Sequence, residues 1–205
     1  MAYYGPKDSG VKTVSLWPGF NALDGVSYEV SSFDNNGIIS EASVSPKGVV
    51  SYTLTGTSEN DARAYIYIVV HSTNYEDKTV EVTVDVDATP PTGSIAIHDT
   101  TILWTNFLES SSFGTFLKKN NQAVTITGSD VGGKPVDIWY FVSDNRMTLD
   151  AVKEMADTEW TALSQNGTIS LLDGKNVIYA KLKDHVGNTT YLSSNGIVIM
   201  RMQQE

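Results

Sequence analysis

The segment from Thr79 to Asp87 alternates strictly, with valine at every even position and a threonine or an acid at every odd position. Successive side chains of a β-strand point to opposite faces, so this period of two places four valines on one face and polar groups on the other. An α-helix would scatter the same valines around its axis. The segment is therefore predicted to be a strand with one buried and one solvated face.

The composition extends this prediction to most of the chain, which holds 21 Val, 13 Ile and 21 Thr against 12 Leu and 12 Ala. Branching at Cβ favours strands over helices. Turn residues such as Asp24-Gly25 and Pro46-Lys47-Gly48 separate short alternating runs. The run 64–70 is apolar on both faces, which predicts a central strand covered on each side or pressed against neighbouring aromatics. The other strands expected before it lie around Val14 and over 26–30, 38–45 and 50–54.

A domain boundary is predicted at Asp87-Ala88-Thr89-Pro90-Pro91-Thr92. Two successive prolines cannot donate ladder hydrogen bonds and hold the chain extended, so the strand pattern stops there. The domains expected are residues 1–88 and 89–205. The acidity lies mostly in the first, where 5 basic and 12 acidic residues give −7, against 9 and 12, or −3, in the second.

The second domain resumes the strand pattern and interrupts it once with a helical period. Thr148 is the expected N-cap, and Leu149, Val152 and Met155 share one helical face. Turn signals recur every 8 to 12 residues in both halves, which is typical of β-sandwiches. The predicted fold class is all-β, with two tandem immunoglobulin-like β-sandwiches and one short helical insertion in the second. The strands expected in the second domain lie around Ile95, Val124 and Trp160 and over 136–142, 169–172, 176–183 and 190–200.

Charge and residue content exclude several function classes. The net charge is −10 and the longest basic run is Lys118-Lys119, so nucleic acid is not an expected partner. No stretch approaches the roughly 20 apolar residues that span a bilayer, so membrane insertion is not expected either. The absence of cysteine excludes disulfides, thiolate metal sites and cysteine nucleophiles. Residues 1–6 lack the basic end and apolar core of a signal peptide.

Several motifs in both halves resemble known bacterial repeats. In the first half, Val50-Ser51-Tyr52-Thr53 and Ser72-Thr73-Asn74-Tyr75-Glu76-Asp77 resemble repeat modules of large surface proteins of Gram-positive gut bacteria. In the second half, Asp184-His185-Val186-Gly187-Asn188 follows Tyr179-Ala180-Lys181, and Gly196-Ile197-Val198-Ile199 closes the domain. This combination is similar to the bacterial immunoglobulin-like repeat of cell-wall proteins.

The resemblance implies a non-catalytic stalk or adhesin segment outside the cell, associated with the cell wall. The expected partners are neighbouring domains of the same surface protein and a host or cell-wall glycan or protein that contacts the loops. The chain is expected to be monomeric, and to be a fragment that lacks a signal peptide and an anchor. Residues 200–205 depart from the family pattern, in which a further Asp-x-Thr-x-Pro linker follows the closing strand. The alternative function is a carbohydrate-binding accessory module of an extracellular glycoside hydrolase.

Aromatic residues are the candidates for ligand contact, because binding sites combine aromatic surface with a few polar groups. Trp139 lies in a predicted strand, where one of its two faces has to be core. Trp160 is expected to be buried. A loop cluster is the best candidate for contact with a sugar or a protein, and packing over the open end of the sandwich is the competing interpretation. The cluster consists of Trp104, Phe107, Phe113 and Phe116.

Calcium is the metal that the sequence leaves open, since no other cofactor is indicated. Asp85 and Asp87 precede the prolines and Asp130 ends a later strand, so hard oxygen ligands flank the domain junction. The solvated face of a strand accounts for Asp85 and Asp87 without a metal. The three histidines lack zinc-ligand spacing.

An enzyme is not predicted. Asp184 and His185 could form an acid-base pair, but an aspartate that opens a turn with Gly187 is ordinary hairpin chemistry. The sequence contains no Gly-x-Ser-x-Gly, phosphate-binding loop or His-Glu-x-x-His motif. An isopeptide bond from Lys12 is a further alternative, although the closing strand of its domain, 79–87, holds no asparagine.

Overall fold

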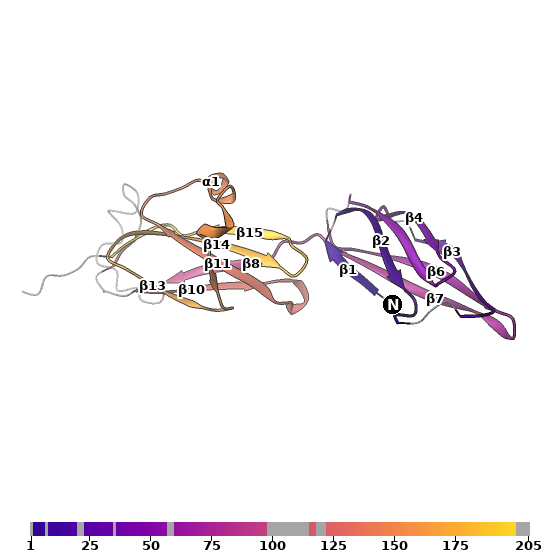
Figure 1. The fold of residues 1–205 in the computed structure, drawn as a ribbon. Coiled ribbons are helices and arrows are strands. Elements are labelled where there is room, and N and C mark those ends of the chain that lie inside the picture. The colour runs from indigo at the N-terminus through magenta and orange to yellow at the C-terminus, as the bar shows by residue number, and fades with distance from the viewer. Residues whose placement is uncertain are drawn as a thin grey trace, which may run out of the picture. The chain divides into compact units, whose positions relative to one another are not determined.

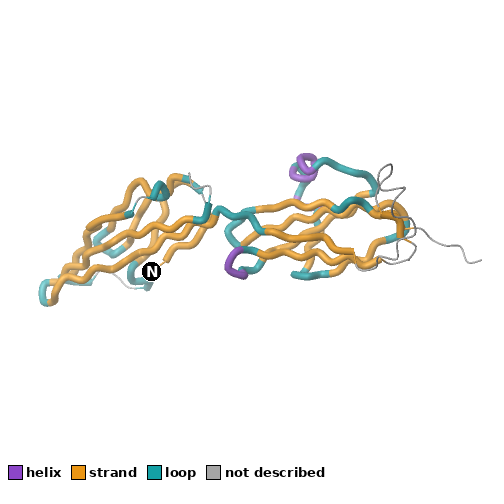
Figure 2. The backbone as a smooth tube through the Cα atoms, turned by 180° about the vertical axis from the view of Figure 1, so that it is seen from behind, coloured by secondary structure: helices purple, strands orange, loops and turns teal. Residues whose placement is uncertain are grey.

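The computed structural model describes residues 2–6, 8–19, 23–34, 36–56, 60–97, 115–117 and 122–199. The chain divides into two compact units, Met1–Thr89 and Pro90–Glu205, one residue after the predicted boundary. Strands make up most of both units, as the tube in Figure 2 shows. The predicted fold class is confirmed: the chain forms two tandem β-sandwiches of the immunoglobulin-like kind, with a short helix in the second.

The first unit consists of two sheets, one with the order β1-β7-β6-β3 and one with the order β2-β5-β4. All neighbours are antiparallel except β1 and β7, which run parallel (Figure 1). The sequence had not indicated β1. The bounds are β1 Ala2–Pro6, β2 Ser9–Ser15, β3 Val26–Phe33, β4 Ile39–Val44, β5 Val49–Thr55, β6 Ala62–Ser72 and β7 Tyr75–Asp87.

The core of the first unit lies between these sheets. The valines of the alternating segment face inward on β7 as predicted, and Val82 and Val84 are fully buried. Facing them across the layer are side chains of the second sheet, among them Val50 and Leu54. Nonpolar side chains thus fill the space between the layers, and burying them is the main favourable term in folding.

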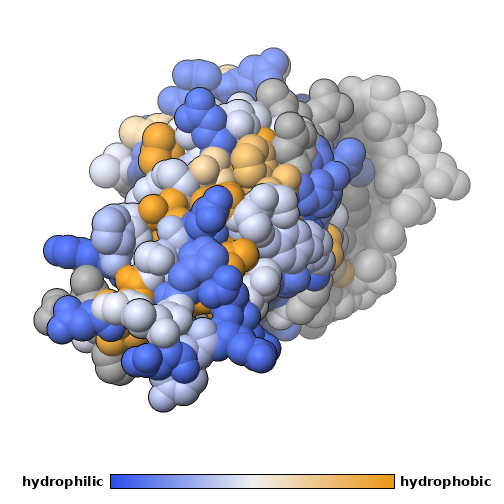
Figure 3. All heavy atoms as spheres, turned by 90° about the vertical axis from the view of Figure 1, so that its right-hand side faces the viewer, coloured by the Kyte–Doolittle hydropathy of each residue, from blue (hydrophilic) through white to orange (hydrophobic). Residues whose placement is uncertain are grey.

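Strand β6 departs from the expectation. Its central place in the sheet is confirmed, and Ala64, Ile66 and Ile68 have no exposed surface. The opposite face carries Tyr65 and Tyr67, which are half-buried. Of the two arrangements predicted for this strand, cover on both faces does not occur, because the outer face of a two-layer sandwich borders solvent. Figure 3 shows small apolar areas between hydrophilic residues on the visible side of the first unit.

The second unit also has two sheets. One has the order β13-β10-β8, and the other has the order β12-β11-β14-β16-β9, with β15 paired to β14. Their buried side chains form a second core that includes Ile126, Ile138 and Leu182. The bounds are β8 Thr92–Ile97, β9 Thr115–Leu117, β10 Gln122–Ser129, β11 Val136–Ser143, β12 Thr161–Leu163, β13 Thr168–Leu171, β14 Gly174–Asp184, β15 Thr189–Ser193 and β16 Ile197–Ile199.

The predicted helix is α1, Leu149–Lys153, which lies beside β14 and β15 in Figure 1. Thr148 caps it as expected, and its hydroxyl accepts a hydrogen bond from the Ala151 amide at 3.2 Å. Two 3-10 turns, η1 Val131–Gly133 and η2 Asp157–Glu159, complete the helical segments of the described residues. The segment around α1 covers the outer face of β11 and β14, where a small third core surrounds Val152 and Trp160.

Candidate functional site

The predicted aromatic loop cluster cannot be placed as a group. Trp104, Phe107 and Phe113 lie outside the described residues, and the backbone of Phe116 belongs to β9. Their part in ligand contact stays a prediction.

Trp139 lies on the outer face of β11, against the small third core. The Lys181 ammonium lies 5.6 Å from the centroid of the Trp139 ring and 6.0 Å from that of Trp160. The same ammonium pairs with the Asp157 carboxylate at 2.6 Å, and this hydrogen bond and charge lower the pKa of Asp157. The Trp139 ring therefore has packing partners within the unit, so the reason for treating it as an open sugar platform is weaker.

Trp160 is buried as predicted, with 8 % of its surface exposed. Its ring meets Phe141 edge to face at 6.5 Å and tilts against Tyr191 at 6.0 Å. Such geometry is favoured between aromatic rings and stabilises the packing of the insertion on the sheet.

Asp184 has a structural role at the turn between β14 and β15. Its side chain is buried, and Oδ1 accepts hydrogen bonds from the amides of Val186, Gly187 and Asn188 at 2.9, 2.6 and 2.9 Å. Oδ2 accepts a fourth from Asn188 Nδ2 at 2.8 Å. Gly187 has φ 105°, which an L side chain rarely adopts. The aspartate thus acts as the acceptor that shapes the turn, while His185 is exposed.

The three predicted calcium ligands have different surroundings within their own units. Asp85 forms a two-point ion pair with Arg63, and Asp87 is buried and accepts a hydrogen bond from the Thr89 amide at 3.1 Å. Both carboxylate oxygens of Asp130 are buried and have no hydrogen-bond partner among the described residues. A buried carboxylate without a donor is costly, so Asp130 is the member that a cation would help most. Calcium binding stays a prediction.

The outer face of β6 and β7 brings together groups suited to ligand contact. We call it the tyrosine face and define it by six outward side chains, three on each strand. Tyr65 lies opposite Thr83, and Tyr67 lies opposite Glu81. The two tyrosine rings stack at 6.3 Å between centroids with an interplanar angle of 27°. The six residues are Arg63, Tyr65, Tyr67, Glu81, Thr83 and Asp85.

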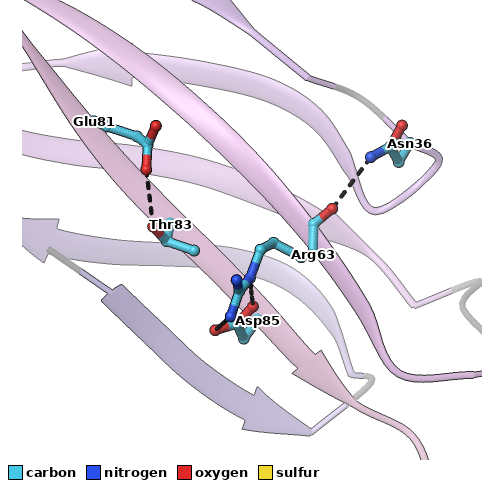
Figure 4. A network of polar contacts seen from close by, with 5 residues as sticks. All are labelled: Asn36, Arg63, Glu81, Thr83 and Asp85. Atoms are coloured by element: carbon cyan, nitrogen blue, oxygen red, sulfur yellow. Dashed lines mark hydrogen bonds and ion pairs between the residues drawn. The ribbon is translucent and has the colours of Figure 1, made fainter.

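A polar network frames this face, as Figure 4 shows. Arg63 donates to Asp85 from Nε at 2.5 Å and from a terminal nitrogen at 3.0 Å, and the Thr83 hydroxyl donates to Glu81 at 3.4 Å. Asn36 Nδ2 reaches the Arg63 carbonyl at 3.2 Å from the neighbouring loop. The hydrogen bond to Asp85, with a further one to the Tyr65 hydroxyl, raises the pKa of Arg63. The cation is therefore engaged within the protein.

The same outer face continues to the far end of β6, where His71 lies between two acids. Its Nδ1 is 2.9 Å from the Asp77 carboxylate on β7, and its Nε2 is 3.7 Å from Glu29 on β3. All three side chains are more than a third exposed, so the contributions of these pairs to stability are small.

A shallow hollow on the other sheet offers a second surface. It encloses about 490 Å³ over β4 and β5, with Phe33 and Val11 at its sides. Its polar groups include Glu41, Ser51 and Thr53. Hydroxyl groups therefore outnumber aromatic rings here, since Tyr52 is buried in the core.

Asp61 holds the end of the first unit. Its Oδ1 accepts hydrogen bonds from the Ala88 amide at 3.0 Å, from the Thr89 amide at 3.1 Å and from the Thr89 hydroxyl at 2.7 Å. Burial raises the pKa of Asp61, but these hydrogen bonds outweigh it, so the pKa lies below its ordinary value of 3.8. The exit of the chain from β7 is thereby fixed to the residue that precedes β6.

The sequence prediction missed the tyrosine face, although its signal was present. Tyr65 and Tyr67 are two residues apart on a strand whose intervening positions are aliphatic, so both rings had to share one face. One of the two predicted arrangements placed that face under cover, and the other placed it against neighbouring aromatics. The polar residues of β7 at the same register positions indicate solvent instead, and pairing the two strands would have revealed this.

No family model and no curated protein matches the sequence. Solved structures that align with it include the fibronectin(III)-like modules of CbhA from Clostridium thermocellum. That alignment has 14 % sequence identity and a TM-score of 0.37, and it covers 98 % of this chain and 89 % of that one. Protocadherin gammaB7 EC3-6 aligns at 13 % identity and TM-score 0.32, covering 98 % and 45 %. BT4661, a SusE-like surface located polysaccharide binding protein of Bacteroides thetaiotaomicron, aligns at 11 % and 0.29, covering 97 % and 33 %. The chain thus spans less than half of the last two.

In the described part of the chain, α1 and the two 3-10 turns are all far shorter than a helix that crosses a membrane.

Proposed function

We propose that the chain is a non-catalytic structural and adhesive segment of a secreted bacterial surface protein. In this proposal it is a monomeric stalk or spacer, associated with the cell wall of a Gram-positive organism. Its partners are neighbouring domains of the same protein and a glycan or protein that its surface contacts. The repeat motifs quoted from the sequence support the bacterial setting.

The parallel pairing of β1 with β7 is the observation that carries the mechanical role. Five residue pairs, from Ala2 opposite Thr83 to Pro6 opposite Asp87, join the first strand of the unit to its last. In a parallel pair, the start of one strand and the end of the other lie at opposite ends of the ladder. Tension applied to both ends of the unit therefore slides the strands along each other, and the hydrogen bonds share the load.

The polar groups of the first unit support the same interpretation. Asp61 ties Ala88 and Thr89 to the start of β6, so tension that enters after β7 meets a fixed segment.

In the second unit, the carboxylate of Asp184 accepts four hydrogen bonds within the turn between β14 and β15. The strongest acid-base candidate of the sequence thus has a structural use, which supports a non-catalytic role.

Single-molecule force spectroscopy tests this proposal on the full chain held at both ends. The variant carries Tyr3→Pro and Tyr4→Pro, because proline lacks the amide hydrogen and successive residues point their amides to opposite sides. At least one hydrogen bond between β1 and β7 is then lost whichever amide is paired. We expect the unfolding force of the first unit to fall, while that of the second unit stays as in the wild type. An unchanged force for the first unit would contradict the mechanical role of β1.

A carbohydrate-binding accessory module of an extracellular glycoside hydrolase is the second candidate. The tyrosine face favours it, because two stacked rings border solvent beside hydroxyl and carboxylate groups. The two functions are compatible, since a spacer can also adhere to the polymer that it crosses. Binding of polysaccharide decides whether the adhesive role has this ligand.

A further inference from the structure

We propose that the tyrosine face of the first unit binds a neutral polysaccharide chain, with sugar rings stacked on Tyr65 and Tyr67. This inference rests on the adhesive part of the proposed function and names its ligand class and site. It takes the place of Trp139, which packs against the small third core and has the Lys181 ammonium over its ring, as the aromatic contact.

The two rings form a prepared platform. They lie two positions apart on the outer face of β6, with 27° between their ring planes and part of each side chain exposed. The alternate residues Ile66 and Ile68 are fully buried in the core. Because β6 is hydrogen-bonded on both sides, by β7 and β3, its backbone is held in place. A rigid support of this kind lowers the entropy cost of binding.

Polar groups lie beside the rings at the spacing of one strand. Thr83 and Glu81 are the cross-strand neighbours of the two tyrosines, and directly opposed side chains have Cβ atoms about 4.5 to 5.5 Å apart. A hydroxyl and a carboxylate at this distance can bond the equatorial hydroxyls of a sugar whose C–H face covers the ring. On the side of β3, the Ser31 hydroxyl donates to the Tyr67 carbonyl at 3.2 Å.

The charges on this face favour a neutral ligand. Arg63 is neutralised by its two-point pair with Asp85, and two carboxylates beside the single imidazole of His71 leave the far end anionic. The first unit carries −7, from 5 basic and 12 acidic residues. An anionic glycan would meet repulsion without a cation ready to bind it, whereas a neutral, hydroxyl-rich chain needs only the rings and their polar neighbours.

The test measures binding of the full chain to soluble neutral polysaccharides, namely hydroxyethylcellulose, xylan, galactomannan and laminarin, by affinity electrophoresis and calorimetry. Heparin and polygalacturonate are the anionic arms. We expect binding to at least one neutral polymer, a loss of tenfold or more in Tyr65→Ala and in Tyr67→Ala, and no measurable binding in the double variant. Tyr75→Ala is the matched control, because Tyr75 is 80 % exposed at the turn between β6 and β7, away from the stacked rings.

Further readouts keep the result independent of folding defects. Circular dichroism and melting temperature show whether each variant is folded. Thr83→Ala is a further variant of the tyrosine face, and it changes only a side chain on the outer face of β7. In the wild type, titration with the bound polymer should shift amide resonances of β6 and β7. Shifts confined to the hollow over β4 and β5, with binding lost in Thr53→Arg instead, would overturn the proposal.

Failure of this inference differs from failure of the proposed spacer function. Three outcomes would each overturn the tyrosine face as the site. They are absence of binding to every neutral polymer, binding to heparin or polygalacturonate alone, and binding that persists in the double variant. None of these outcomes changes the force needed to separate β1 from β7. Conversely, a low unfolding force with intact binding would reject the mechanical role of β1 and leave the tyrosine face supported.

Discussion

Replacing Asp184 with alanine should unfold the second unit more easily, because one carboxylate organises the whole turn between β14 and β15. The wild-type side chain accepts three backbone amides on Oδ1 and the Asn188 amide group on Oδ2. A hydrogen bond to a charged group contributes about 1.5 to 3 kcal/mol. A sum over four bonds would overstate the loss, since three of them share one oxygen and Gly187 is exposed, so water can replace the acceptor there.

The loss expected is therefore that of one or two such bonds, about 2 to 4 kcal/mol. Asp184→Asn separates shape from charge, because its neutral oxygen can still accept the three amides while its NH₂ group faces the Asn188 amide. About half of the loss, 1 to 2 kcal/mol, is expected for this variant. Asp137→Ala is the control, an exposed acid on β11 in the same sheet, and should change the free energy of unfolding by about 0.5 kcal/mol or less.

Urea unfolding followed by tryptophan fluorescence measures these differences, since Trp104, Trp139 and Trp160 belong to the second unit and only Trp17 to the first. The two units are fitted as separate transitions, because multidomain chains do not unfold in one step. If Asp184→Ala lowers the midpoint no more than Asp137→Ala does, the carboxylate does not hold the turn. The acid-base interpretation of Asp184 and His185 would then have to be reopened.

Three further results are expected. The pKa of Asp61 is lowered in the fold, so its ionised form stabilises the first unit at pH values above the ordinary pKa of 3.8. This stabilisation is lost as the pH falls through the lower pKa of the folded state. The melting temperature of Asp61→Asn should therefore lie below that of the wild type at pH 7, and the difference between the two melting temperatures should close below pH 4. Gly93→Ala should destabilise the second unit by about 2 to 3 kcal/mol in urea unfolding, because a Cβ there would lie 2.1 Å from the Thr127 carbonyl oxygen and 2.5 Å from Leu182 Cδ1. Calcium should raise the melting temperature and Asp130→Asn should abolish the rise, while a melting temperature that chelator leaves unchanged would contradict the calcium prediction.

Local periodicity was sufficient to predict the elements that depend on near neighbours. The valines of β7 and the cap at Thr148 follow from residues within one strand or one helical turn, and both were predicted correctly. Strand β1 was missed because its partner lies about eighty residues further along the chain, at Thr83 to Asp87. A five-residue edge strand of this kind has little periodicity of its own and is defined by the ladder that it joins.

Cover over a sheet face is the property that sequence patterns could not supply. Alternation tells which side chains share a face, but another segment decides whether that face meets solvent. Trp139 and Tyr67 have equivalent patterns, each an aromatic residue on a strand with apolar neighbours. Both side chains are partly buried, but Trp139 packs against the small third core with the Lys181 ammonium over its ring, while Tyr67 stacks on Tyr65 on the outer face of β6. The aromatic contact inferred from sequence and the one inferred from structure differ for this reason.

The stacked tyrosines also have a structural use, so a loss of binding in an alanine variant needs a companion measurement. A cross-strand or same-face aromatic contact contributes roughly 0.2 to 1 kcal/mol, and Tyr67→Ala would remove part of it together with the ligand surface. Tyr65→Phe and Tyr67→Phe keep the ring and its stacking but remove the hydroxyl groups. If the rings serve only the sheet, these variants and the wild type should share one melting temperature and show no difference toward any polysaccharide. Because we expect a sugar chain to use both the ring face and the polar rim, the phenylalanine variants should keep the wild-type melting temperature, within about 2 °C, and bind the neutral polymer measurably more weakly.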